Sequence, residues 1–264
     1  MMFSRCSVKL TNDENASISI AYIIFKEQMV NEAMVGAIRV DSKDDGGRGP
    51  FGALLLAGDP HLPGIVLFHG RNSNPDGPVV GQLRRSLAAA GYTTLSLENP
   101  LPPTGDEFAD YLTDVGGPNY VFPEAGARAA AALRELQRLN VRSVVLLGFS
   151  MGSRLLSAFL ASDKNERLPI LGFVGLGLGV NGAGPLNATT TLRNVRVPVL
   201  DICGDADADV ANSAPHRKAS YEAGPGKSYR QVVLTGGIPH NFAGAGAELE
   251  RTVLDWLRKL QLPA

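Results

Sequence analysis

The chain has 264 residues, enough for one large domain with a complete core, and its composition (44% hydrophobic, 19% charged) is typical of a globular protein. Its net charge of −1 provides no electrostatic basis for binding nucleic acid or an acidic membrane surface. No apolar run approaches the length of a membrane span, and the start of the chain lacks the apolar core and cleavage site of a signal peptide. Because Cys6 and Cys203 lie far apart, we expect no disulfide, which fits a reducing compartment. Without a signal peptide or a membrane span, we expect a cytoplasmic location.

The first 48 residues are predicted to form an N-terminal extension. Within it, residues 17–25 have the pattern of a strand, and residues 27–40 have that of a short helix or a second strand. A turn-rich stretch at 41–50 separates this region from the rest of the chain. Residues 49–264 are predicted to form one further domain.

From residue 51 onwards, short apolar runs alternate with amphipathic segments. Strands are predicted at 51–57, 64–68, 92–97, 141–147, 169–175, 197–203 and 229–234. Helices are predicted at 79–90, 123–140, from residue 150 to about 161, 215–222 and 248–260, with loops at 99–120 and 177–194. This alternation predicts an α/β fold in which a mostly parallel central sheet carries helices on both faces.

The segment 144–154 has the sequence VVLLGFSMGSR, in which a buried strand, a sharp turn and a helix follow one another. Gly148 and Gly152 flank Ser150, and a side chain at either glycine would collide with the neighbouring strand and helix. The turn lifts the hydroxyl of Ser150 clear of the sheet, and the following helix directs backbone N–H groups toward it. The G-x-S-x-G pattern in this context indicates a nucleophile, although an ordinary strand-to-helix turn is the alternative.

A serine nucleophile needs a base within hydrogen-bond reach and a carboxylate that orients the base. His240 follows the last predicted strand, and because the carboxyl ends of parallel strands converge on one crevice, we expect it to be the base rather than a solvated loop histidine. The acid is expected after the strand at 197–203, where Asp205, Asp207 and Asp209 compete. Asp207 stands far enough from the strand to point back at the histidine. Asp209 is the second choice, and Asp205 is interpreted as a residue that caps the turn.

These residues resemble the α/β-hydrolase superfamily, and in particular small lid-less esterases and dienelactone-hydrolase-like serine hydrolases. The resemblance covers residues 51–262 and rests on the order Ser150, Asp207, His240, on the His69-Gly70 turn and on the Gly204-Asp-Ala-Asp207 turn. It implies an α/β-hydrolase fold. The usual position of a lid corresponds to residues 177–194, which are too few for a helical lid domain, so we expect an open cleft.

The resemblance also implies roles for the residues around the His69-Gly70 turn. The backbone N–H groups of Met151 and Arg71 are expected to form an oxyanion hole, with Asn72 as a further donor. His69 is expected to support its loop and not to act as the base. The side chain of Arg71 is interpreted either as a carboxylate-binding group at the cleft mouth or as a solvated arginine.

The sequence therefore predicts a serine hydrolase that acts on a small-molecule carboxylic ester or thioester. We expect no cofactor and no metal, because the chain has no metal-ligand spacing, phosphate loop or dinucleotide fingerprint. An acyltransferase or a peptidase uses the same triad, and a non-catalytic ligand-binding protein of this fold is the alternative from another class. The sequence carries no signal for a particular oligomeric state.

Overall fold

The computed structural model describes residues 34–100, 121–162 and 168–260. The predicted strand at 17–25, the first part of the predicted segment at 27–40 and most of the predicted loop at 99–120 lie outside the described residues. None of the helices in the described ranges combines the length and the apolar character that a membrane-spanning helix needs.

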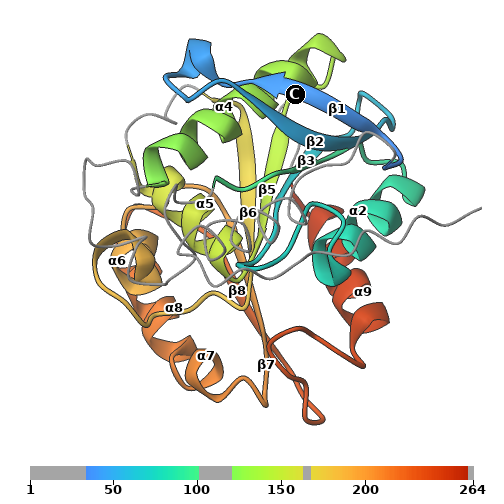
Figure 1. Ribbon diagram of the computed structural model, residues 1–264. Coiled ribbons are helices and arrows are strands. Elements are labelled where there is room, and N and C mark those ends of the chain that lie inside the picture. The colour runs from blue at the N-terminus through green and yellow to red at the C-terminus, as the bar shows by residue number, and fades with distance from the viewer. Residues whose placement is uncertain (1–33, 101–120, 163–167, 261–264) are drawn as a thin grey trace, which may run out of the picture.

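Eight strands of the described chain form a single sheet in the order β1-β2-β4-β3-β5-β6-β7-β8 (Figure 1). The pairs β1–β2 and β2–β4 are antiparallel, and the remaining neighbours are parallel. The prediction of a mostly parallel sheet is therefore confirmed. The strands are β1 (Ala37–Asp41), β2 (Pro50–Leu56), β3 (Gly64–Phe68), β4 (Thr94–Leu97), β5 (Val144–Phe149), β6 (Ile170–Leu176), β7 (Val199–Gly204) and β8 (Tyr229–Leu234).

Two hydrophobic cores, one on each face of the sheet, explain why the central strands are apolar at successive positions. In β3 every residue is buried, with Val66 and Phe68 in one core and Ile65 and Leu67 in the other. Successive side chains of a strand point to opposite faces, so a strand covered on both faces must be apolar throughout. This is the pattern from which these strands were predicted.

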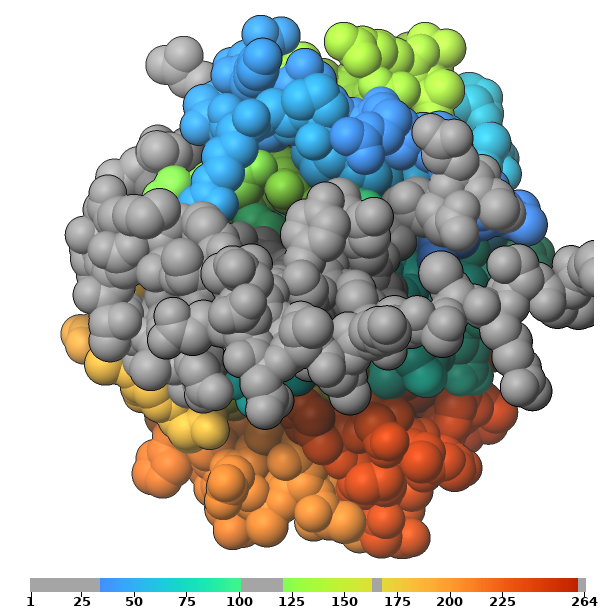
Figure 2. All heavy atoms as spheres, viewed as in Figure 1, coloured from blue at the N-terminus to red at the C-terminus, as the bar shows by residue number. Residues whose placement is uncertain are grey.

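Helices cover both faces of the sheet, as Figure 1 shows. Helices α2 (Pro78–Ala89) and α9 (Gly246–Leu257) contribute to one core. The other core takes side chains from α4 (Phe122–Arg138), α5 (Met151–Ala161), α6 (Ala188–Leu192) and α8 (Ala214–Glu222). The first strands form one edge of the sheet and β7 and β8 the other, so the blue and the orange-to-red segments occupy opposite ends of the space-filling view (Figure 2).

The structure corrects two details of the predicted elements. Residues 177–194 are not a loop throughout, because they contain the 3-10 helix η3 (Gly184–Leu186) and helix α6. Helix α6 begins after Asn187, whose side-chain oxygen accepts the Thr189 N–H at 2.9 Å. Helix α7 (Ala208–Asn212) was not predicted, because five residues are too few to show helical periodicity.

The described part of the predicted N-terminal extension belongs to the same sheet. Strand β1 pairs with β2 and forms the edge, and the 3-10 helix η1 (Lys43–Asp45) connects the two. Gly49 and Ser42 close this connection, since the Ser42 hydroxyl donates to the Gly49 carbonyl at 2.9 Å. The division of the chain at residue 48 stays a prediction.

Candidate active site

Ser150 lies in a strained turn between β5 and α5. Its backbone has φ 53° and ψ −114°, a conformation that residues with a side chain rarely adopt. A Cβ atom on Gly152 would lie 2.3 Å from the Phe68 carbonyl oxygen, and one on Gly148 would lie 2.5 Å from Ser153 Cα. The residues two positions before and two positions after the serine must therefore be glycine, for the steric reason that the sequence suggested.

Three loops at the carboxyl ends of parallel strands bring Ser150, Asp207 and His240 together. His240 Nδ1 lies 2.5 Å from Asp207 Oδ2, and His240 Nε2 lies 2.9 Å from Ser150 Oγ. With the imidazole proton on Nδ1, the histidine donates to Asp207 and the serine hydroxyl donates to Nε2. The three residues predicted as nucleophile, acid and base thus form one hydrogen-bonded chain. Their roles in catalysis stay predictions.

The three aspartates that follow β7 have different surroundings. Asp207 precedes α7 but does not cap that helix with its side chain, which is only 14% exposed and points to His240. Asp209 lies in the first turn of α7 and is exposed. Asp205 is also exposed, yet its carboxylate reaches beyond its own turn and accepts backbone N–H groups from the loop that carries His240. The description of Asp205 as a turn cap is therefore incomplete.

The imidazole of His240 lies against β5 and the segment that follows β6. The rings of Phe149 and His240 have centroids 5.3 Å apart. A Cβ atom on Gly177 would lie 2.8 Å from His240 Cε1, so glycine at this position makes room for the ring. The sequence showed Gly177 only as one of several glycines in a predicted loop, and nothing in its local pattern linked it to a histidine 63 positions later.

His69 is buried beside the site and makes hydrogen bonds that suit a supporting residue. Its Nδ1–H donates to the Gly70 carbonyl at 2.7 Å, and its Nε2 accepts the Asn99 N–H at 3.1 Å. The Asn99 side chain in turn donates to the His69 carbonyl at 2.6 Å. Burial lowers the pKa of His69 to about 4, so the ring stays neutral near neutral pH. This geometry agrees with the expectation that His69 supports its loop.

The expected oxyanion-hole residues lie close to the serine. Met151 is the first residue of α5, and Arg71 follows the His69-Gly70 turn. A Cβ atom on Gly70 would lie 3.3 Å from Ser150 Cβ, so this turn passes directly beside the nucleophile. Asn72, the expected further donor, has a positive φ of 53°. The donor roles of these backbone groups stay predictions.

Ser150 and His240 line a pocket of about 770 Å³, a volume within the usual size range of small-molecule sites. Met151, Val180 and Val210 supply apolar surface, while other residues of the lining are polar. The polar lining residues include Arg71, Arg154, Asn181, Asn212, Ser213 and His216. Among the described residues, no group of three His, Cys, Asp or Glu side chains is arranged to hold a metal ion.

No protein-family model matches the sequence, and no curated protein matches it. Solved structures do match. A dienelactone hydrolase from Anabaena variabilis ATCC 29413 is 21% identical, with a TM-score of 0.63 over 86% of this chain and 97% of that one. The thermophilic carboxylesterase EstE1, from a metagenomic library, is 14% identical, with a TM-score of 0.66 over 94% and 96% of the two chains. Est1E from Butyrivibrio proteoclasticus is 16% identical, with a TM-score of 0.59 over 85% and 98%.

The chain has the α/β-hydrolase fold. The similarity in structure extends over most of each protein. This chain has a mostly parallel sheet, and its described residues contain no large lid. The fold resemblance noted from the sequence is therefore confirmed. At these sequence identities, the likeness establishes the fold and leaves the reaction to be argued from the site.

In this α/β-hydrolase fold, Arg154 ties the segment after β6 to the helix that follows the nucleophile. The residue lies one turn into α5 and is buried. Its Nη1 donates to the carbonyls of Asn181 at 2.6 Å and Leu186 at 3.2 Å, and its Nη2 donates to the Asn181 side chain. Burial and then the charge of Arg71 lower the pKa of Arg154, to about 10, so it remains a cation near neutral pH. It thereby holds one wall of the pocket in place.

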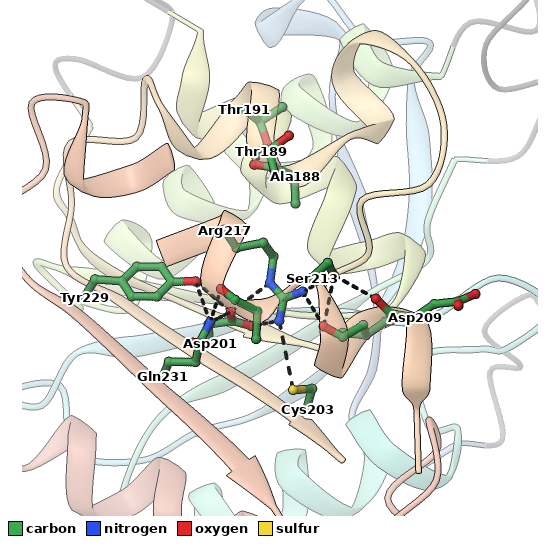
Figure 3. Close-up of polar contacts among 12 residues, drawn as sticks. Ala188, Thr189, Thr191, Asp201, Cys203, Asp209, Ser213, Arg217, Tyr229 and Gln231 are labelled. Carbon is green, nitrogen blue, oxygen red and sulfur yellow. Dashed lines mark hydrogen bonds and ion pairs between the residues drawn. The ribbon is translucent and has the colours of Figure 1, made fainter. Parts of the chain in front are cut away.

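A buried ion pair joins β7 to α8, and Figure 3 shows its two residues, Asp201 and Arg217. Arg217 of α8 and Asp201 of β7 both have side chains with no exposed surface, and Arg217 Nε lies 2.8 Å from Asp201 Oδ2. The same carboxylate oxygen accepts the Tyr229 hydroxyl at 2.6 Å and the Gln231 amide at 2.9 Å. Burial, and then the charge of Asp201, raise the pKa of Tyr229, so its hydroxyl keeps the proton that it donates.

Arg217 also connects this pair to helix α7. Its Nη1 donates to the Val210 carbonyl at 2.7 Å and to the Ser213 hydroxyl at 2.8 Å (Figure 3). Val210 and Ser213 line the pocket. Asp207 immediately precedes α7, so the buried ion pair supports both the acid-bearing turn and a wall of the pocket. The sequence did not predict it, because a pairing between residues 16 positions apart on different elements leaves no local pattern.

Proposed function

We propose that the protein is a serine hydrolase that cleaves small-molecule carboxylic esters or thioesters through an acyl-enzyme on Ser150. The observation that supports this most directly is the hydrogen-bonded chain from Ser150 Oγ through the His240 ring to the Asp207 carboxylate. A nucleophile, a base and an orienting acid in this order are what acyl transfer requires. The strained backbone at Ser150 supports the same role, because strain is commonly retained where it serves function.

The proposed reaction has two halves. In the first, Ser150 Oγ attacks the carbonyl carbon while His240 Nε2 accepts the hydroxyl proton, and the Asp207 carboxylate stabilises the resulting imidazolium. The N–H groups of Met151 and Arg71 are proposed to stabilise the negative oxygen of the tetrahedral intermediate. The imidazolium then gives its proton to the leaving alkoxide or thiolate.

In the second half, a water molecule takes the position of the departed alcohol or thiol. His240 Nε2 accepts a proton from this water as it attacks the acyl carbon, and the reverse proton transfer to Ser150 Oγ releases the carboxylic acid. The half-exposed imidazole is accessible to water from the pocket, since 43% of its side chain is exposed.

The names of the similar structures agree with an ester substrate, since they include a dienelactone hydrolase and a carboxylesterase. Low sequence identity means that they support a class of reaction and no particular substrate. The pocket of about 770 Å³ supports a small substrate.

Labelling with a fluorophosphonate tests the proposal, because this reagent phosphonylates serines activated by a base, with fluoride as the leaving group. Mass spectrometry should find the adduct on the Ser150 peptide of the wild-type protein and no adduct in Ser150→Ala. His240→Gln serves as a second control, since it keeps the serine and removes the base. A panel of p-nitrophenyl esters then measures turnover. Labelling of another serine, or none in folded wild-type protein, would contradict the proposal and favour a non-catalytic protein.

A further inference from the structure

The side chain of Asp205 binds the loop that carries His240. Its Oδ2 accepts the N–H of Gly236 at 2.9 Å and that of Gly237 at 3.2 Å, and its Oδ1 accepts the N–H of Ile238 at 2.7 Å. Three successive backbone donors thus converge on one carboxylate, two residues before His240. The loops after β7 and β8 lie at the bottom of Figure 1.

The backbone of the His240 loop is shaped to present these donors. Gly236 and Gly237 have φ values of 108° and 81°, which side-chain-bearing residues rarely adopt. Successive N–H groups in such a conformation form a concave site for an anion. Because these N–H groups favour the charged form, with Ile238 contributing most, the pKa of Asp205 lies below its ordinary value and the group is a carboxylate at neutral pH.

Two backbone hydrogen bonds also join the loop after β7 to the end of β8 and the loop after it, next to the Asp205 carboxylate. The Asp205 N–H donates to the Leu234 carbonyl at 2.9 Å, and the Ala206 N–H donates to the Ile238 carbonyl at 3.0 Å. These bonds continue the parallel pairing of β7 and β8 into the loops. They bind the loop only through Leu234 and Ile238, whereas the Asp205 side chain binds the three amides of residues 236–238.

His240 depends on the position of its loop, because 43% of its side chain is exposed and the loop backbone sets where the ring begins. Its ring must meet Asp207 Oδ2 at 2.5 Å and Ser150 Oγ at 2.9 Å at the same time. Only Pro239 separates Ile238 from His240, and the proline ring restricts φ at that residue. A displacement of Ile238 is therefore transmitted to the imidazole with little opportunity for compensation.

We propose that Asp205 is a positioning residue that holds His240 between Ser150 and Asp207 by binding the amides of residues 236–238. This rests on the proposed function, since it assigns His240 the part of the base. Asp205 touches neither the substrate nor the reacting atoms. It acts through the loop, and it makes the acid-bearing turn and the base-bearing loop one unit.

The test compares Asp205→Asn with Asp59→Asn. Asparagine keeps the size of the side chain but removes the charge and replaces one acceptor oxygen by a donor, so it cannot satisfy all three amides. Asp59 is the matched control, because it is also an exposed turn aspartate that accepts a backbone N–H, that of His61 at 2.9 Å. It lies before β3, at the end of the sheet opposite the site.

Asp205→Asn is expected to lower kcat for a p-nitrophenyl ester by about 100-fold, because a displacement of about 1 Å at a reacting group can cost this much. KM should change little, since the pocket wall is untouched. Two readouts need no turnover. The amides of residues 236–238 should exchange hydrogen faster, and the far-downfield proton resonance of the His240–Asp207 hydrogen bond should shift or disappear. That resonance is assigned by its absence from Asp207→Asn. Asp59→Asn should match the wild type in all of these measurements.

Unchanged kcat and an unchanged resonance in Asp205→Asn would overturn the inference. So would a fall in kcat with the resonance unchanged, because Asp205 would then act other than through His240. If Asp205→Asn does not fold, Asp205→Glu decides the matter, since it keeps the charge and displaces it by one methylene. Faster amide exchange with an unchanged resonance in that variant would also overturn the inference. Failure of the proposed function itself would be recognised separately, by the absence of an adduct on Ser150 in the wild type.

Discussion

The buried histidine at position 69 leads to a prediction about stability at acid pH. The folded protein keeps the His69 ring neutral, with its pKa lowered from 6.5 to about 4, whereas the unfolded chain takes up a proton near pH 6.5. Between these values the unfolded state binds more protons, so the free energy of unfolding falls as the pH decreases through this range. The contribution is fully present above pH 6.5 and is lost by about pH 4.

The magnitude follows from the size of the pKa difference. At about 1.4 kcal/mol per pKa unit, a fall from 6.5 to about 4 corresponds to about 3 kcal/mol of stability. His69 is only 2% exposed, so solvent does not reduce this amount appreciably. Protonation would also break the bond in which Nε2 accepts the Asn99 N–H. For a domain whose total stability is about 5–15 kcal/mol, this loss is large enough to measure.

Urea unfolding of the wild type and of His69→Gln, at several pH values from above 6.5 down to about 4, measures the effect. The single tryptophan, Trp256, is buried in a core and reports unfolding by fluorescence. His69→Gln should be less stable than the wild type at neutral pH, because the buried hydrogen bonds of the imidazole are lost. The difference should shrink by about 3 kcal/mol toward pH 4. His61→Gln, which removes an exposed histidine, should retain the wild-type loss of stability.

Parallel curves for the wild type and His69→Gln would refute this reasoning, since they would mean that the protonation of His69 is not coupled to folding. Fluorophosphonate labelling distinguishes the roles of His69 and His240, the two histidines near the nucleophile. His69→Gln should still be labelled at Ser150 by a fluorophosphonate, whereas His240→Gln should not. Loss of labelling in folded His69→Gln would contradict the supporting role assigned to His69.

Three further predictions concern the ion pair, the acid and the pocket. Arg217→Met should lower the free energy of unfolding by about 3–5 kcal/mol in urea, because it leaves the Asp201 carboxylate buried without its counter-ion. Asp207→Asn should lower kcat by about 10⁴-fold, as expected for the acid of a serine triad, while exposed Asp209→Asn should retain most activity. In a series of p-nitrophenyl esters, rates should favour short acyl chains and fall beyond about ten carbons, since most residues that line the pocket are polar and offer a long chain little apolar surface.

Each of these predictions has an outcome that contradicts it. A loss below about 1 kcal/mol in Arg217→Met would show that the ion pair only offsets its own desolvation. An inactive Asp209→Asn beside an active Asp207→Asn would move the acid by two residues along the chain. Rates that increase steadily with chain length, or activation at a lipid surface, would argue against the small open pocket.

The sequence by itself determined the features whose causes are local. Strands buried on both faces are apolar at successive positions, so β3 and β5 were predicted within a few residues of their observed bounds. Glycine stands at positions 148 and 152 because a side chain at Gly148 would meet the helix that follows Ser150 and one at Gly152 would meet the neighbouring strand β3, and five consecutive residues show this pattern. His240 was predicted as the base for a different reason, because it follows the last strand and the carboxyl ends of parallel strands meet at one edge of the sheet.

The tertiary structure alone decided which side chains those ends bring into contact. Asp205 and Asp207 are two residues apart in the same turn, yet one carboxylate binds amides of the neighbouring loop and the other binds the imidazole. The sequence favoured Asp207 as the acid by its distance from the strand, but it did not reveal that Asp205 binds the neighbouring loop, because that contact depends on how the loops after β7 and β8 lie against each other. The same holds for Gly177, whose missing side chain makes room for a ring supplied by a distant segment. Such contacts depend on distances between elements, which a single sequence does not contain, whereas turns and strands depend on the sterics of neighbouring residues, which it does.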